Sequence, residues 1–190
     1  MLLDYLANIP DRRRAQGKRY KLHHFLLFAI FAILSGAKSY RDVNRFITKR
    51  LKELNKLFAL EWKHAPSKSQ VRDIIADADR KAVEKEFRKY SESLQCKIGE
   101  SSYSVGIDGK ALKGSFDHSS TQDMLQLLSA FCAETKIILG HVDIGEKTNE
   151  IPTAQQLIRE LGLPEGTVYT ADAMHCQKKH LKRLKKRKVN

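Results

Sequence analysis

The hydrophobic pattern of this chain changes once, near residue 100, and that change limits the fold more than any other feature. Before it, apolar residues recur every three or four positions, which is the pattern of amphipathic helices. After it, short alternating runs rich in β-branched and aromatic residues follow, which is the pattern of strands. The sequence therefore predicts an α+β protein, with an α-helical domain over residues 1–95, a linker over 96–102 and a mixed α/β domain over 103–190.

Four helices are expected in the first domain, and they cover residues 22–34, 40–58, about 68–78 and 80–94. The first is apolar almost all round, so we expect it to be buried. It is shorter than the roughly 20 residues that span a bilayer. Ser39 is expected to cap the second helix, which has an apolar stripe and a basic side. The last two helices have the outline of a helix-turn-helix without the sequence of a recognition helix.

Strands are expected in the second domain over 103–107, 125–133, 136–144 and 168–171, with helices over 150–161 and 174–188. Glu134-Thr135 separates the two middle strands, which indicates a hairpin. The order is a strand, a hairpin, a helix, a strand and a helix. This order predicts a mixed sheet with a crossover helix after an antiparallel hairpin.

Two aspartates each follow a predicted strand, Asp108 after the first and Asp172 after the last. Gly109 follows Asp108 directly, so a hairpin turn is an equally good interpretation of Asp-Gly when taken alone. Two such aspartates instead predict a carboxylate pair built by adjacent strands. Carboxylate oxygens are ligands of Mg²⁺ and Mn²⁺, and a pair of such ions supports phosphodiester chemistry.

The formal net charge of +13 is unevenly distributed. Residues 1–68 hold 15 Lys or Arg and 5 Asp or Glu, residues 69–172 hold 12 and 17, and residues 173–190 hold 8 and none. Basic flanks around an acidic centre suit a polyanion such as DNA, although a solvated surface is the alternative for any one basic segment. The cations expected to contact DNA are Arg12, Arg13, Arg14, Arg41, Arg45, Lys49, Lys110, Lys113, Lys178, Lys182 and Arg183.

Three cysteines without close spacing indicate a reducing, cytoplasmic setting, and the N-terminus lacks the regions of a signal peptide. We therefore expect a protein that is not bound to a membrane.

Three ordered segments, 105–115, 147–151 and 170–178, resemble the blocks of DDE transposases of the H-repeat-associated type, which belong to bacterial insertion sequences. Residues 9–13 and 34–37 resemble the helical domain that precedes their core. The resemblance implies a ribonuclease-H-like sheet, DNA as the substrate, Mg²⁺ or Mn²⁺ as the cofactor, and a nucleoid-associated protein that can form a homodimer. It also implies a catalytic triad of two aspartates and a glutamate. Asp108 and Asp172 match the two aspartates, while Lys147, Asn149 and Glu150 match a block near the site.

The third acid of that triad lies beyond the second aspartate in the family, yet residues 173–190 contain no Asp or Glu. We therefore expect a C-terminally truncated transposase with an incomplete core, which is inactive on its own. A DNA-binding remnant without catalysis is the alternative. An uncovered sheet edge could also leave such a chain unstable.

Overall fold

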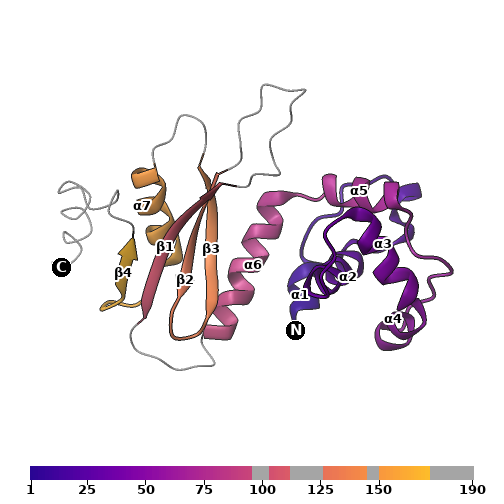
Figure 1. Ribbon diagram of the computed structural model, residues 1–190, viewed down its shortest axis with the longest axis horizontal. Helices are drawn as coiled ribbons and strands as arrows, with labels where there is room; N and C mark the ends of the chain where they lie inside the picture. Colours follow the sequence, from indigo (N-terminus) through magenta and orange to yellow (C-terminus); the bar gives the residue numbers. More distant parts are fainter. Residues whose placement is uncertain (96–102, 112–125, 145–149, 172–190) are drawn as a thin grey trace, which may run out of the picture. The chain divides into compact units, whose positions relative to one another are not determined.

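The computed structural model describes residues 1–95, 103–111, 126–144 and 150–171 (Figure 1). The chain consists of two compact units, Met1–Phe87, called the helical unit below, and Arg88–Asn190, called the sheet unit. Helices precede a mixed sheet, so the expected α+β class is confirmed. The helical unit holds α1 (Leu2–Ala7), a 3₁₀ helix (Ala15–Arg19), α2 (Leu22–Leu34), α3 (Tyr40–Lys49), α4 (Leu51–Phe58), α5 (Lys68–Ala76) and the first half of α6 (Arg80–Gln95).

The helix α2 lies at the centre of the helical unit, as its apolar sequence predicts. Phe25, Phe28 and Ala32 on it are fully buried, and each buried phenylalanine contributes roughly 1.5–3 kcal/mol through the hydrophobic effect. Gly36 ends the helix with a left-handed φ of +93°, and the N–H of Ala37 donates to the carbonyl of Ala32. Among the described residues, no helix has both the length and the hydropathy of a membrane span.

The prediction of one continuous helix over residues 40–58 is wrong in one respect. The helix breaks at Arg50, where φ is −106° and ψ is 12°. The break separates α3 from α4. It lets Phe58 at the end of α4 pack against Phe28 and Phe31 of α2, with ring centroids 5.2 and 6.5 Å apart. No glycine or proline marks the break, so tertiary packing is its cause. Ser39 caps α3 as predicted, since its Oγ accepts from the N–H of Asp42.

Four strands form one mixed sheet in the order β3-β2-β1-β4 (Figure 1). They are β1 (Ser104–Ala111), β2 (Gln126–Cys132), β3 (Ile137–Ile144) and β4 (Val168–Ala171). β1 and β2 are antiparallel, as are β2 and β3, whereas β1 and β4 are parallel. The helix α7 (Glu150–Leu161) connects β3 to β4, so the hairpin and the crossover helix are both present as predicted.

The sheet has one face covered by α7. Val105, Ile107, Leu128 and Leu139 point to that side and pack with α7 in one apolar core. The second half of α6 lies along the outer strand β3 (Figure 1). There Arg88 and Ser91 donate to the β3 carbonyls of His141 and Ile138, each at 3.0 Å. These side chains occupy an edge that is otherwise free to pair with another strand.

Candidate functional site

Asp108 lies within β1 and is exposed, while its neighbour Ile107 is buried. The strand continues to Ala111 because β2 pairs with it as far as the Ala111–Gln126 pair. The expectation that the strand ends at Asp108 is therefore wrong. The alternative of an Asp-Gly turn is also excluded, since Asp108 pairs with Ser129 and Gly109 with Leu128.

The parallel pairing of β1 with β4 bears directly on the predicted carboxylate pair. Its last described partners are Ile107 and Ala171, which are the residues immediately before Asp108 and Asp172. Asp172 itself lies outside the described residues. The two strands that precede the predicted aspartates are thus neighbours in the sheet, and they run in the same direction.

The face of the sheet away from α7, called the Asp108 face below, carries side chains that the sequence interpretation missed. Directly opposed residues on neighbouring strands share a face, so Asp108, Ser129 and His141 form one row across β1, β2 and β3. Strands lie about 4.8 Å apart, which puts the backbone of His141 roughly 10 Å from that of Asp108. Alternation along a predicted strand places each residue on one of two faces. Only the strand register shows which residues of neighbouring strands lie opposite one another.

Two neighbours of Asp108 on this face are small, whereas Phe131 and Leu127 of β2 lie diagonally across from it. Gly106 precedes it by two positions, and Ser129 lies opposite it. A Cβ placed on Gly106 would be 3.7 Å from the Thr170 hydroxyl of β4, so that hydroxyl lies beside Gly106. The Asp108 carboxylate therefore has no bulky side chain at these two positions, and a hydrated cation or a phosphate can approach it.

Of the other site residues predicted in the sheet unit, the structure describes only some. Lys110 is exposed and lies two residues beyond Asp108 on the same face. Glu150 is the first residue of α7, and its side chain is outside the described part. Lys113, Lys147, Asn149, Lys178, Lys182 and Arg183 also lie outside the described residues.

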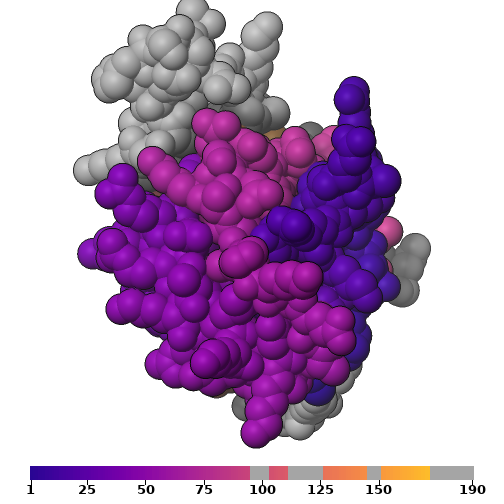
Figure 2. Space-filling view, turned by 90° about the vertical axis from the view of Figure 1, so that its right-hand side faces the viewer, coloured from indigo at the N-terminus to yellow at the C-terminus, as the bar shows by residue number. Residues whose placement is uncertain are grey.

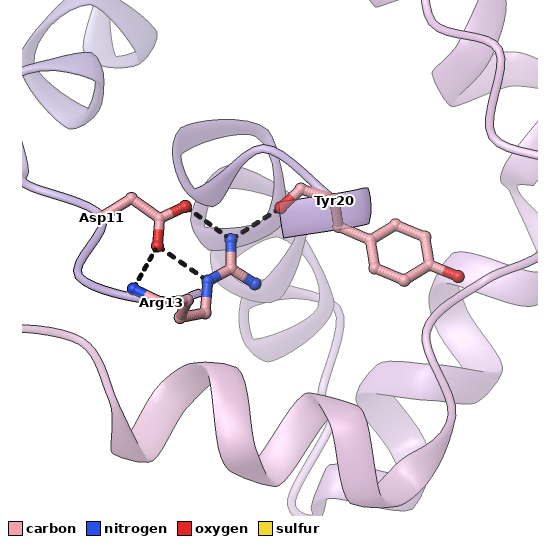
Figure 3. A network of polar contacts seen from close by, with 3 residues as sticks. All are labelled: Asp11, Arg13 and Tyr20. Carbon is pink, nitrogen blue, oxygen red and sulfur yellow. Dashed lines mark hydrogen bonds and ion pairs between the residues drawn. The ribbon is translucent and has the colours of Figure 1, made fainter. Parts of the chain in front are cut away.

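Arg13 in the helical unit is largely buried and contacts Asp11 and Tyr20 (Figure 3). Its side chain is only 6% exposed, and its Nε and Nη2 donate to Asp11 at 2.9 and 2.8 Å. Nη2 also donates to the carbonyl of Tyr20 at 2.7 Å. The hydrogen bond from Arg13 lowers the pKa of Asp11. Arg13 thus stabilises the segment before α2, and little of its guanidinium faces solvent.

The remaining predicted cations of the helical unit differ in their partners. Arg12 forms an ion pair with Asp79 at 2.7 Å, and exposed Arg45 lies 3.7 Å from Asp42. Arg14, Arg41 and Lys49 are exposed and have no acidic partner among the described residues. Unpaired, solvated cations are the ones that can neutralise a bound anion without first breaking an ion pair.

The described residues contain no group of three or more His, Cys, Asp or Glu side chains positioned to hold a metal ion. Asp108 provides one exposed carboxylate. Magnesium keeps several water ligands and is commonly held by one or two carboxylates, and Asp108 is one exposed carboxylate of that kind.

Sequence comparisons identify relatives of this chain. The family described as DDE_Tnp_1-associated matches residues 3–91. "Putative transposase YncI" of Escherichia coli K12 is 30% identical over 189 residues, which cover the whole chain and 75% of that protein. "H repeat-associated putative transposase YhhI" of the same strain is 28% identical over 187 residues, which cover 97% of this chain and 48% of YhhI.

The chain spans about half the length of several relatives, including the YncI protein of Escherichia coli O157:H7, of which it covers 47%. No solved structure matches the chain significantly.

Proposed function

Because this chain belongs to the H repeat-associated transposase family, we propose that it acts on DNA in metal-dependent cleavage and strand transfer. The observation that carries the proposal is the pairing of Ile107 with Ala171 on parallel strands. If that pairing continues by one residue, Asp108 and Asp172 are neighbours and both reach the Asp108 face. Neighbouring carboxylates of this kind are the oxygen-rich pocket that a divalent cation needs.

Asp108 and Asp172 would hold Mg²⁺ or Mn²⁺ in this proposal. A bound divalent ion activates a water or hydroxyl and stabilises the leaving oxygen in phosphodiester chemistry. Lys110 on the same face would attract the DNA phosphate, and the small residues Gly106 and Ser129 would leave it room. Lys147, Asn149 and Glu150 would lie near this site.

The sequence offers candidates for two of the three acids that the family implies, and residues 173–190 contain none. We therefore propose that Asp108 and Asp172 bind the cation and that cleavage needs a third acid in addition to them. A homodimer, a cytoplasmic location and association with the nucleoid belong to the same proposal.

Calorimetric titration with Mn²⁺ tests the cation site independently of catalysis. Asp108→Asn and Asp172→Asn should each weaken Mn²⁺ binding at least about tenfold, since each would remove a charged ligand. Asp143→Asn is the matched control, because Asp143 is another exposed acid of the same sheet and lies outside the proposed pair. Affinity that is unchanged in the Asp108 and Asp172 variants would contradict the proposal.

A DNA-binding protein without catalysis is the second candidate, and the unpaired cations Arg14, Arg41 and Lys49 favour it. DNA affinity would then fall steeply with salt. It would also be the same for Asp108→Asn and the wild type, with and without Mn²⁺. Binding of DNA that strengthens with Mn²⁺ only when Asp108 is present would instead support the metal-dependent enzyme.

A further inference from the structure

The helices α2 and α3 are joined by a short turn in the helical unit. Five residues, 35–39, separate them, and Gly36 provides the left-handed conformation that the turn needs. A helix-turn-helix also joins two helices by a turn that often contains glycine, and its usual turn of three or four residues is slightly shorter than this one. The second helix of such a pair lies in the major groove of DNA.

One face of α3 holds the helix in the unit. Val43 and Ile47 are buried, and α3 packs against both α2 and α5. Asn44 beside this face donates to the carbonyl of Pro66 at 2.7 Å, and Ser39 caps the first turn. The helix is therefore fixed in its unit along its length, which a helix that reads DNA requires.

The opposite face of α3 is exposed and basic. Arg41, Arg45, Thr48 and Lys49 are all exposed, and their spacing of i, i+4, i+7 and i+8 puts them on one side of the helix. The acid Asp42 accepts hydrogen bonds from Ser39 and the N–H of Lys38, which lower its pKa. It also lies 3.7 Å from Arg45 in an exposed ion pair, which is worth about 0–1 kcal/mol and can be exchanged for a contact to DNA. The surface of the helical unit, including α3 and α4 in purple, faces the reader in Figure 2.

The pair α5–α6, which the sequence suggested as a helix-turn-helix in outline, has a different charge pattern. Asp77 and Asp79 lie in its junction, and Asp73 lies in the last turn of α5. Arg72 on α5 is engaged by Asp73 through contacts of 3.0 and 2.8 Å, and Asp79 caps α6. Acids at the junction repel phosphates, so this pair is the poorer candidate for DNA contact.

We propose that α3 enters the major groove of duplex DNA and reads base edges with Arg41 and Arg45, while Lys49 contacts the phosphate backbone. The inference rests on the proposed DNA function and specifies the surface that recognises sequence. A helix about 10–12 Å across fits a major groove about 12 Å wide. The ten residues of α3 give it a length of about 15 Å. Arginine is the side chain that most often makes a bidentate contact to guanine there.

Fluorescence anisotropy with a labelled random-sequence duplex measures the contribution of each cation. Arg41→Ala and Arg45→Ala should each raise Kd at least about fivefold, because each removes a positive charge held close to the DNA. Lys68→Ala and Arg72→Ala on α5 are matched controls, exposed in the same unit, and should change Kd less than about twofold. Circular dichroism and the fluorescence of Trp62, the single tryptophan, report whether each variant is folded.

Selection from a pool of randomised duplexes tests base reading itself. The wild type should enrich a motif. Arg41→Lys keeps the charge but loses the planar fork, so it should bind random duplex as the wild type does and enrich a weaker motif. The inference is overturned if no motif is enriched, if the α3 variants bind as the wild type does, or if all four alanine variants lose affinity equally. Mn²⁺ binding by Asp108 is measured separately, so failure here leaves the proposed catalytic role standing.

Discussion

The helical unit and the sheet unit position their candidate functional residues by different means. In the helical unit, a residue's exposure follows from its place on a helix face, so Arg41 is exposed because Val43 and Ile47 are buried. In the sheet unit, Asp108 gains its neighbours from strand register, which joins residues far apart in sequence. The first arrangement is local and the second is not. Exposure in the helical unit can therefore be predicted from the sequence of one helix, whereas the neighbours of Asp108 depend on the pairing of distant strands.

The largest expected effect comes from the core of the helical unit. Phe28→Ala removes a fully buried ring that lies 5.2 Å from both Phe58 and Trp62, so it should lower the free energy of unfolding by about 3–5 kcal/mol. Chemical denaturation followed by Trp62 fluorescence measures it. Leu57→Ala is the control, since Leu57 is 74% exposed, and it should change stability by less than about 0.5 kcal/mol. Equal losses in the two variants would contradict the assigned core.

Arg13 and Arg14 test whether neighbouring arginines have separate roles. Arg13→Ala removes the guanidinium hydrogen bonds to the Asp11 carboxylate and the Tyr20 carbonyl, so it should destabilise the helical unit by about 1–3 kcal/mol. Arg14→Ala removes an exposed cation and should leave the unfolding free energy within about 0.5 kcal/mol of the wild type. Its DNA affinity should fall instead. If Arg14→Ala were the more destabilising of the two, the division between fold and surface would be wrong.

The two units should respond to acid in different pH ranges. Burial lowers the pKa of His24 below its ordinary 6.5, and the charges of His23 and Lys21 lower it further. The unfolded chain then binds the proton more readily, so the stability of the helical unit should be full above pH 6.5 and decrease as the pH falls through that value. Denaturation followed by Trp62 fluorescence at several pH values measures this decrease. His24→Phe should reduce it, and an unchanged pH dependence would contradict the buried, neutral histidine.

The acid response of the sheet unit should begin at lower pH. Glu134 accepts hydrogen bonds from the side chain and the N–H of Ser104, and these lower its pKa from 4.5 to about 2. The unit should therefore keep this stabilisation above pH 4.5 and lose it as the pH falls towards 2. Hydrogen exchange of the β1 amides, compared between the wild type and Glu134→Gln, measures the difference. A variant as well protected as the wild type at neutral pH would contradict it.

The sequence predicted local structure better than contacts between distant segments. The bounds of α7 and β4 were predicted correctly, as were the hairpin of β2 and β3 and the cap at Ser39, because alternation and capping are local signals. The break at Arg50 was missed, since it comes from packing against α2. The burial of Arg13 was also missed, because its partners Asp11 and Tyr20 give no periodic signal.

The candidate site was predicted in part. Asp108 was identified from its place after a strand-like run, although the strand continues to Ala111. Ser129 and His141 were missed because only the register of three strands brings them into a row with Asp108. The linker over 96–102, the helix over 174–188 and the role of Asp172 remain predictions.

A crystal structure of the chain grown with Mn²⁺ tests the central claim most directly, because the anomalous scattering of manganese locates the ion. We predict one peak on the Asp108 face, with a carboxylate oxygen of Asp108 and one of Asp172 both at about 2.0–2.2 Å from it. A peak elsewhere, or carboxylates of these two residues on opposite faces of the sheet, would contradict the account.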